Sequence, residues 1–405
     1  MSYLWRAARP LQAASLYVLL FLLPFSKSTV EITFGLLLLG WVLERLNPAT
    51  RAKTIWLSGR LRPLALAVIA YLAACALSIL VSDFPGLSVS GFINKWLEYL
   101  LFFVIVADVA RRPEVMKISL TVLACSTLAV FIHGIAQEVL IATVPYRETM
   151  PIFHYGRMTG PYENPIDLAT YLMVIIPILL GFSISQRGIR RAGIWAVLLL
   201  GLGSLARTEA LGAWIGFWIG LLVMMRQSHA IRRAGSIVLI GSLLACAVFL
   251  HHSGHLRQTS SPSEIGKVDR LVTWRAAIKM IRDRPVLGHG LNTFMANYLK
   301  YWVGGEHQPR YAHNCYLQVA AETGLLGLAA FLWLLWCLGV RLAHSVRFAH
   351  GDHRALLLGL CAGLLGFALQ AGIDTNFYAL RQAALFWVLS GLALGLSDAG
   401  SAAEV

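Results

Sequence analysis

The sequence predicts an all-α polytopic membrane protein with about twelve transmembrane helices, both termini in the cytoplasm, and a helical periplasmic loop region. Three observations lead to this fold class. The 405 residues are 58% hydrophobic and only 13% charged, whereas soluble domains carry about 25% charged residues. Apolar runs of membrane-spanning length recur along the chain. Basic residues gather in alternate loops, as the positive-inside rule describes.

The apolar runs set the number of helices. Each is close to the ~20 residues that cross a ~30 Å hydrocarbon core as a helix. The runs lie at 11–25, 29–46, 62–82, 88–110, 115–139, 165–186, 191–206, 209–226, 231–250, 315–342, 354–373 and 379–397. The seventh and eighth are close together, so eleven spans is the alternative. No small-residue cleavage site follows the first run, and we expect it to remain as a membrane helix.

The charges indicate the orientation. If the N-terminus is cytoplasmic, 19 basic residues fall in cytoplasmic loops and five in the short outer loops. Nine more lie in the outer loop at 251–312, which the charge rule does not cover because long loops translocate regardless of charge. The net charge of +14 therefore reflects membrane topology rather than nucleic-acid binding.

Three regions follow from this topology. Residues 1–250 hold transmembrane helices 1–9, with a short periplasmic loop at 140–164. Residues 251–312 form a large periplasmic loop that contains an amphipathic helix. Residues 313–405 hold transmembrane helices 10–12. A loop of this length is usually functional, so we expect the site in the large loop and its surroundings.

Several kinds of chemistry find no support in the sequence. The six cysteines show no Cys-x-x-Cys spacing and lie mostly inside apolar runs, so we expect no disulfide and no structural metal. There is no Walker motif, which argues against ATP hydrolysis. No Asp-x-Asp pair or His/carboxylate cluster stands outside the membrane, so no divalent metal is implied.

Residues 269–282 read as an amphipathic helix. Asp269 is a plausible N-cap, and an Arg284-Pro285 step followed by Gly288-His289-Gly290 ends the helix. At 100° per residue the apolar stripe consists of Leu271, Trp274, Ile278 and Ile281. The opposite face carries Arg275, Lys279 and Arg282, which suits solvent or headgroups. Arg270 points with the apolar stripe, either snorkelling outward or aimed at a phosphate or carboxylate.

The segment at 311–324 leads directly into an apolar run. Asn314, Gln318 and Glu322 repeat at i, i+4 and i+8 and form one polar stripe, while His313 lies off it. A helix over 313–342 would span ~45 Å, more than the ~30 Å core. We therefore expect His313 at or above the outer interface, or a kink near Gly324. The alternative for His313 is a purely structural role at a helix start.

Other polar residues of the outer side have structural and functional interpretations. Arg207 occupies a tight turn, where Glu209 or lipid headgroups could be its partners. Arg157 lies in the turn before the sixth span, where Asn164 is placed to cap the helix. In the last outer loop, Asp374 and Arg381 could pair with each other.

Arg157, Arg207, Arg270 and His313 all fall on the outer side, above apolar helices. A ligand with a long apolar tail and a di-anionic head fits this combination. Arginine holds phosphate in a bidentate fork and stays charged. A histidine can act as a general base near neutral pH. A pyrophosphate leaving group could then be stabilised by arginines alone.

Three motifs together resemble the O-antigen ligase and polymerase superfamily of bacterial envelope glycosyltransferases. One is the small-loop arginine, Arg207. Another is the segment AHNCYLQVAAETGLLG at 312–327, whose His-Asn-x-x-Leu-Gln-x-x-x-Glu-x-Gly pattern is the most specific. The last is an arginine-tryptophan helix with a Pro-x-x-Gly-x-Gly ending, formed by Arg270, Trp274, Pro285, Gly288 and Gly290. The resemblance spans roughly residues 155–395, and the N-terminal helices match only in hydropathy.

The resemblance implies a metal-independent, inverting glycosyl transfer on the periplasmic face of the inner membrane, with no cofactor. The donor would be O-antigen on undecaprenyl diphosphate and the acceptor lipid A–core, which completes lipopolysaccharide. By position, His313 would be the base or acceptor-positioning residue. The pyrophosphate would be bound by Arg207 and Arg270, with Arg157 beside them and Arg275 as the alternative on the other helix face. The supporting residues would be Asn314, Gln318, Glu322, Asn164, Asp374 and Arg381.

Three readings of the function remain open. A single outer loop of about sixty residues and the short C-terminal end favour the ligase over a protein-glycosylating relative. An O-antigen polymerase shares the topology, the arginines and the carrier. A transporter of lipid-linked glycan would place polar residues near the midplane and show symmetry between halves, whereas here the polar residues gather at the outer interface.

Overall fold

We analysed a computed structural model of the chain, which describes residues 2–47, 56, 59–142, 157–252, 262–304, 308 and 310–402. All regular structure in these ranges is helical. Nine helices of the described residues are long and apolar enough to cross a membrane, so the chain is a polytopic membrane protein. Residues 143–156 of the predicted loop at 140–164, and parts of the loop at 251–312, lie outside the described residues.

Every predicted apolar run corresponds to a helix. In chain order these are α1 (Ser2–Leu22), α2 (Lys27–Leu46), α3 (Arg62–Ile79), the continuous rod α4–η3–α5 (Pro85–Gly91, Phe92–Leu97 and Glu98–Val109), α6 (Pro113–Ala142), α7 (Pro165–Ile184), α8 (Gly188–Arg207), α9 (Leu211–Gln227), α10 (His229–His252), α13 (Cys315–Phe348), α14 (Gly351–Gln370) and α15 (Leu380–Ala402). The shorter α9, together with α1 and α2, is not among the nine candidate spans. Twelve spans therefore remains a prediction.

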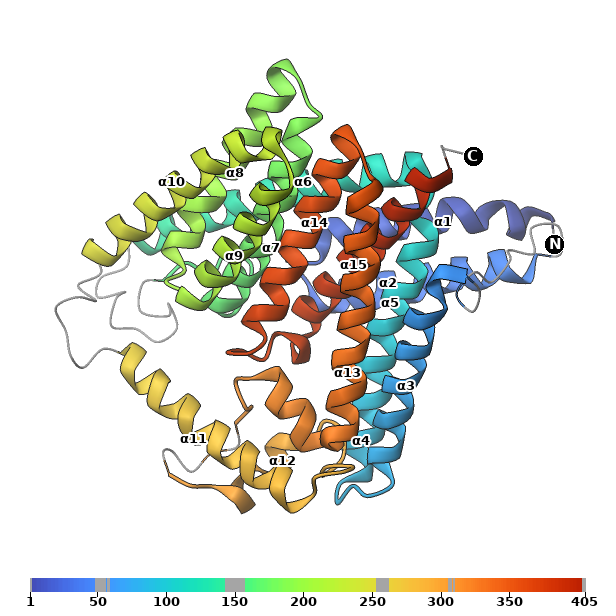
Figure 1. The fold of residues 1–405 in the computed structure, drawn as a ribbon, viewed down its shortest axis with the longest axis vertical. Coiled ribbons are helices and arrows are strands. Elements are labelled where there is room, and N and C mark those ends of the chain that lie inside the picture. Colours follow the sequence, from blue (N-terminus) through green and yellow to red (C-terminus); the bar gives the residue numbers. More distant parts are fainter. Residues whose placement is uncertain are drawn as a thin grey trace.

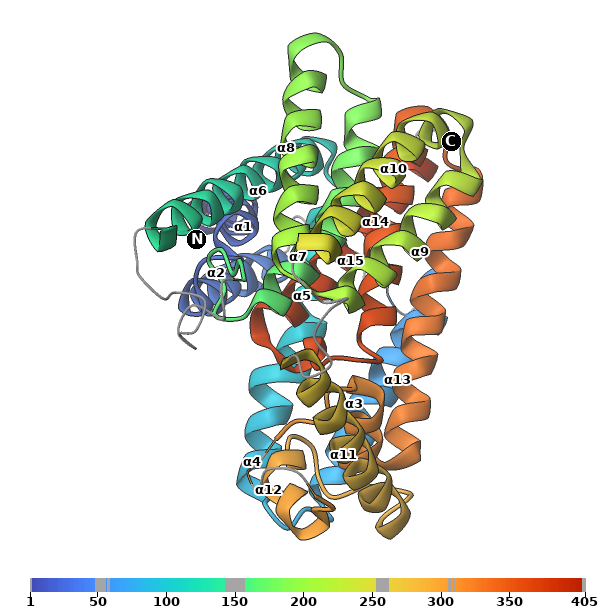
Figure 2. The ribbon, with the colours of Figure 1, turned by 90° about the vertical axis from the view of Figure 1, so that its left-hand side faces the viewer.

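The remaining elements belong to the predicted loop region. These are α11 (Pro262–Asp283), α12 (Phe294–Tyr298) and the short 3₁₀ helix Leu299–Tyr301, with two further 3₁₀ helices at Gly59–Leu61 and Asn376–Tyr378. Both views show α11 and α12 beside the end of α13 that lies away from the N- and C-termini (Figures 1 and 2). The loop region is therefore gathered at one end of the bundle.

Helices α7 and α15 form the centre of the bundle, since nearly all of their residues are buried. Close backbone contact brings α14 against α7. A methyl group on Gly363 would lie 2.5 Å from the carbonyl oxygen of Val174, and one on Gly359 would lie 2.5 Å from that of Pro177. Small residues at such crossings allow membrane helices to approach closely, where van der Waals packing holds them together.

The long helix α13 is broken at Gly324, which has φ 69° and ψ −178°. This confirms the kink that its length predicted. Opposite it, Phe92–Leu97 in the α4–α5 rod is a π-helix, which the sequence did not indicate. An aromatic cluster of Trp96, Phe331 and Phe377 fills the space between these elements, with ring centroids 5.2 to 6.5 Å apart.

Candidate functional site

The turn after α11 is joined to the break in α13 by backbone hydrogen bonds. The amides of His289 and Gly290 donate to the carbonyls of Ala321 and Glu322 at 3.0 and 2.9 Å, and the amide of Leu325 donates to Pro285 at 2.7 Å. The left-handed φ of Gly324 is what frees these groups from the helical pattern. The Pro-x-x-Gly-x-Gly ending thus acts as a clasp that fixes the end of α11 against α13.

The side chain of Glu322 binds the segment that follows the same clasp. Its fully buried carboxylate accepts hydrogen bonds from the amides of Asn292 and Phe294 at 2.8 and 3.2 Å. It also accepts from the Tyr378 hydroxyl at 3.0 Å and from Gln318 at 3.2 Å. Four donors satisfy a carboxylate that would otherwise be costly to bury. The polar stripe is therefore a structural network, and Gln318 extends it by accepting from the Ala312 amide.

Lys95 lies in the α4–η3–α5 rod, three residues before Glu98. Its ammonium donates to Asn292 Oδ1 at 2.8 Å and lies 5.9 Å from the centre of the Tyr378 ring. Asn292 adopts φ 60° and is reached by Lys95 from the α4–α5 rod. This contact ties a third element to the clasp. Local spacing does not predict the pairing, because the two residues are 197 positions apart in the chain.

The buried face of α11 differs from the predicted stripe. Ala276, Ala277 and Met280 are buried in a small core, whereas Leu271 and Ile278 are exposed. Small side chains face inward because α11 lies directly on the segment before α13. The prediction of Asp269 as N-cap is also wrong, since α11 begins at Pro262.

Arg270 stands at the inner side of α11 and is half-buried. The next residues of this face fix its position: Thr273 Oγ1 donates to the Ala312 carbonyl at 3.1 Å, and Trp274 Nε1 donates to the His313 carbonyl at 3.4 Å. Arg275 is exposed on the other side, together with Lys279 and Arg282, as the helical periodicity predicted. Arg270 therefore faces the His313 segment, and Arg275 faces outward.

His313 has a left-handed backbone with φ 48°, which is uncommon for a residue other than glycine and costs conformational free energy. The following residue explains the turn, because Asn314 caps α13 by accepting from the Leu317 amide at 3.0 Å. The Cys315 amide donates to the carbonyls of Ala371 and Asp374 at 2.8 and 3.1 Å. His313 is thus held between α11 and the loop that joins α14 to α15.

Asp374 completes this arrangement. One of its carboxylate oxygens accepts from the Thr375 amide at 2.8 Å, and the side chain lies within electrostatic range of His313 and Arg270. Burial raises the pKa of Asp374, and the Thr375 amide and the charges of His313 and Arg270 oppose that rise. The structure therefore brings a histidine, an arginine and a carboxylate from three separate segments to one place.

A second arginine, Arg157, lies in the segment before α7 and reaches the turn between α8 and α9. The guanidinium of Arg157 donates through Nε and Nη2 to the Thr208 carbonyl at 2.8 and 2.6 Å. Burial and the nearby charge of Arg270 lower its pKa, while Glu209 raises it. Two guanidinium groups close enough to repel each other form a place suited to an anion.

Arg207 lies in the same turn but has a partner of its own. Its Nη2 forms an ion pair with Glu138 on α6 at 2.9 Å, a partner that the sequence did not suggest. Its carbonyl accepts from the Met158 amide at 3.0 Å, so its backbone holds the segment that carries Arg157. The Arg207 side chain as a whole is 45% exposed.

Two other candidates have structural roles. Asn164 caps α7 by accepting from the Ile166 amide at 2.8 Å, as predicted. Arg381 is buried and donates to the carbonyls of Pro24 and Pro161 at 2.9 and 3.1 Å. Its guanidinium lies 4.5 Å from the centre of the Tyr162 ring. Arg381 thus fixes the α1–α2 corner to the turn before α7.

Part of the chain that contains these residues is similar to known proteins. Residues 192–332 match the family described as O-antigen ligase. This range begins within α8 and ends within α13, beyond the break at Gly324, and it includes Arg207, Arg270 and His313. A protein named "Putative polysaccharide ligase" from Rickettsia bellii (strain RML369-C) is 23% identical over 285 residues, which is 65% of this chain and 64% of that protein. The match thus covers under two thirds of the relative's length.

Proposed function

We propose that this chain, in which residues 192–332 match the O-antigen ligase family, transfers O-antigen polysaccharide from undecaprenyl diphosphate to lipid A–core. The transfer completes lipopolysaccharide. It takes place on the periplasmic face of the inner membrane, with both termini in the cytoplasm. This orientation follows from the distribution of basic residues between the two sides.

The convergence of Arg270, Arg157, His313 and Asp374 at one end of the helical bundle supports this function most directly. The donor pairs a long polyprenyl tail with a pyrophosphate. Apolar helices suit the tail, and two neighbouring guanidinium groups suit the pyrophosphate. Arg207, which is paired with Glu138, adds a third guanidinium next to Thr208, the partner of Arg157.

The reaction is a single displacement at the anomeric carbon of the glycan. The acceptor hydroxyl attacks this carbon while His313 takes its proton. The bond from the anomeric carbon to the pyrophosphate oxygen breaks, and undecaprenyl diphosphate leaves with the bonding electrons. Arg270 and Arg157 stabilise the charge that develops on the leaving oxygen. One displacement inverts the configuration at the anomeric carbon.

Asp374 acts on the reaction through the histidine. Its negative charge stabilises the imidazolium that forms when His313 takes the proton, and it also faces Arg270. An acidic partner of this kind orients a catalytic histidine and raises its basicity. The strained backbone of His313 is retained because α11, the Asn314 cap and the α14–α15 loop all fix it.

The lipopolysaccharide banding pattern of a null strain tests the function. For a ligase, the null strain lacks the whole ladder and accumulates long-chain glycan on the lipid carrier, and wild-type protein restores the ladder. For a polymerase using the same donor, the null strain shows core capped with a single repeat unit. For a transporter of lipid-linked glycan, the donor accumulates on the cytoplasmic side without transfer.

A further inference from the structure

A cleft of about 520 Å³ opens between α9, α13 and α14, with Phe386 of α15 at its inner end. It lies toward the end of α13 that carries Arg347, whereas His313 and Arg270 lie at the other end. The cleft is therefore separate from the candidate glycosyl-transfer site. Its volume falls within the ~300–1,000 Å³ range of small-molecule sites.

The walls of the cleft are mostly apolar, and small side chains stand among the larger ones. Gly339 and Ala343 lie on α13, and Cys361, Ala362 and Ala368 lie on α14. A methyl group added to Gly339 would meet no other atom within 4 Å, so this glycine is not needed for helix packing. Missing side-chain volume at these positions leaves the space open between α13 and α14.

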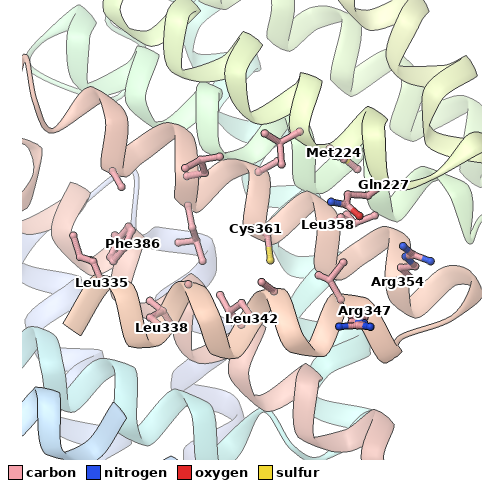
Figure 3. A pocket seen from close by; sticks show the side chains of 18 residues that line it. Met224, Gln227, Leu335, Leu338, Leu342, Arg347, Arg354, Leu358, Cys361 and Phe386 are labelled. Carbon is pink, nitrogen blue, oxygen red and sulfur yellow. The ribbon is translucent and has the colours of Figure 1, made fainter. Parts of the chain in front are cut away.

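One end of the cleft is polar. Figure 3 shows the side chains of Arg347, Arg354 and Gln227 together at this end, and Phe386 and Leu335 at the other. Nε of Arg354 is buried and has no hydrogen-bond partner among the described residues. A buried donor without an acceptor is costly. A bound anion would supply that acceptor, and Arg347 would supply a second charge.

The length of the cleft matches one leaflet. Leu335 and Arg347 mark its ends along α13, and twelve residues at 1.5 Å each extend over ~18 Å. This is slightly more than half of the ~30 Å hydrocarbon core. A molecule with its head at the arginines would thus place its chain along the cleft and end near the middle of the membrane.

We propose that this cleft binds an anionic phospholipid of the leaflet opposite the candidate glycosyl-transfer site. One acyl chain lies between α13 and α14, and the phosphate group accepts hydrogen bonds from Arg347 and Arg354. Two guanidinium groups and an amide at the membrane surface form a site for a lipid headgroup. The apolar walls pack against the acyl chain through van der Waals contacts. The two arginines favour a headgroup with a net negative charge.

Photo-crosslinking tests this proposal directly. The purified full-length protein in nanodiscs would be labelled with phosphatidylglycerol that carries a diazirine in one acyl chain, and labelled peptides would be located by mass spectrometry. We expect labelling of the α13 and α14 segments at 335–343 and 358–368. A phosphatidylcholine probe with the same chains should label these segments at least fivefold less, because its headgroup has no net charge.

Two kinds of variant separate the head from the tail. Arg347→Gln combined with Arg354→Gln removes the charges, and Gly339→Trp fills the cleft; each should reduce labelling at least fivefold. Matched controls are Arg233→Gln, at an exposed arginine of α10, and Gly241→Trp, at a glycine of α10 with open surroundings. Both controls should label like the wild type. Equal labelling by the two probes, or undiminished labelling of the variants, would overturn the proposal.

Discussion

Gly288 and Gly324 face each other so closely that a methyl group on Gly288 would lie 2.6 Å from the Gly324 amide nitrogen. The reverse substitution is no better tolerated, because a methyl group on Gly324 would collide with the carbonyl of Val286. Both glycines also have a left-handed φ, 68° and 69°. The clasp between α11 and α13 thus requires glycine on both sides.

Substitution of either glycine should loosen the clasp. We predict that Gly288→Ala and Gly324→Ala each destabilise the protein by ~1–3 kcal/mol, from the strained backbone together with the steric collision. Thermal unfolding of the purified protein measures this effect. Gly86→Ala is the matched control, since a methyl group there meets nothing within 4 Å. Unfolding temperatures that match wild type in both clasp variants would contradict the account.

Glu322→Gln tests whether the buried carboxylate is a structural anchor. Each carboxylate oxygen accepts one backbone amide, from Phe294 or from Asn292. Whichever position the new amide nitrogen takes, one of these N–H groups loses its acceptor, at a cost of ~1–3 kcal/mol. We expect faster proteolysis of the segment at 285–300. Tyr378→Phe, which removes a single donor, should have a smaller effect, and equal proteolysis rates for Glu322→Gln and wild type would count against the anchor.

His289 gives the clasp a dependence on pH. Burial lowers its pKa below the ordinary value, against the opposing effect of the Met280 carbonyl, which lies 3.1 Å from Nε2. The unfolded chain therefore binds the proton more tightly than the folded chain. Stability is complete above the unfolded pKa of about 6.5 and decreases as pH falls from there toward the folded pKa.

We accordingly predict that the unfolding temperature decreases as the pH is lowered from 7.5 to 5.5. The decrease should be about as large as the contribution of a single titrating histidine. His289→Gln retains a donor for the Met280 carbonyl without a titrating ring, so its unfolding temperature should change less across this range. The comparison of the two slopes is the readout, because other groups contribute equally to both proteins. Parallel slopes would show that His289 does not titrate on unfolding.

Removal of metal should not affect transfer. In the proposed reaction, arginines offset the pyrophosphate charge and His313 takes the proton, so no step requires a divalent ion. We expect the same transfer rate before and after treatment with EDTA, and no increase on adding Mg²⁺ or Mn²⁺. A rate that falls on chelation and returns with one of these ions would show that a metal takes part.

Much of the helical architecture could be predicted, because membrane spans depend on long apolar runs. All the predicted runs are helices, and the kink at Gly324 followed from the excess length of α13 over the membrane core. The Asn164 cap was likewise predictable, since capping is a local interaction. The π-helix at Phe92–Leu97 was not, because its hydrogen-bond pattern leaves no composition signal.

For the candidate site, the sequence indicated which residues to consider, but it did not predict most of their contacts. The inward orientation of Arg270 and the outward orientation of Arg275 follow from helical periodicity alone. The buried face of α11 was misjudged, because Thr273, Ala276 and Ala277 gain burial from a close neighbour that periodicity does not reveal. The pairs Arg207–Glu138 and Lys95–Asn292 join segments distant in sequence, and no local rule predicts them.

The central claim is that His313 and Arg270 perform the transfer, and it is tested most directly with purified protein, undecaprenyl-diphosphate-linked O-antigen and lipid A–core. The transfer rate would be measured for wild type, His313→Ala, Arg270→Ala and Arg275→Ala, with unfolding temperatures as the check on folding. We predict that the first two variants lose ~100-fold or more of the rate, while Arg275→Ala keeps nearly all of it. Retained transfer in folded His313→Ala, or a greater loss in Arg275→Ala than in Arg270→Ala, would contradict the account.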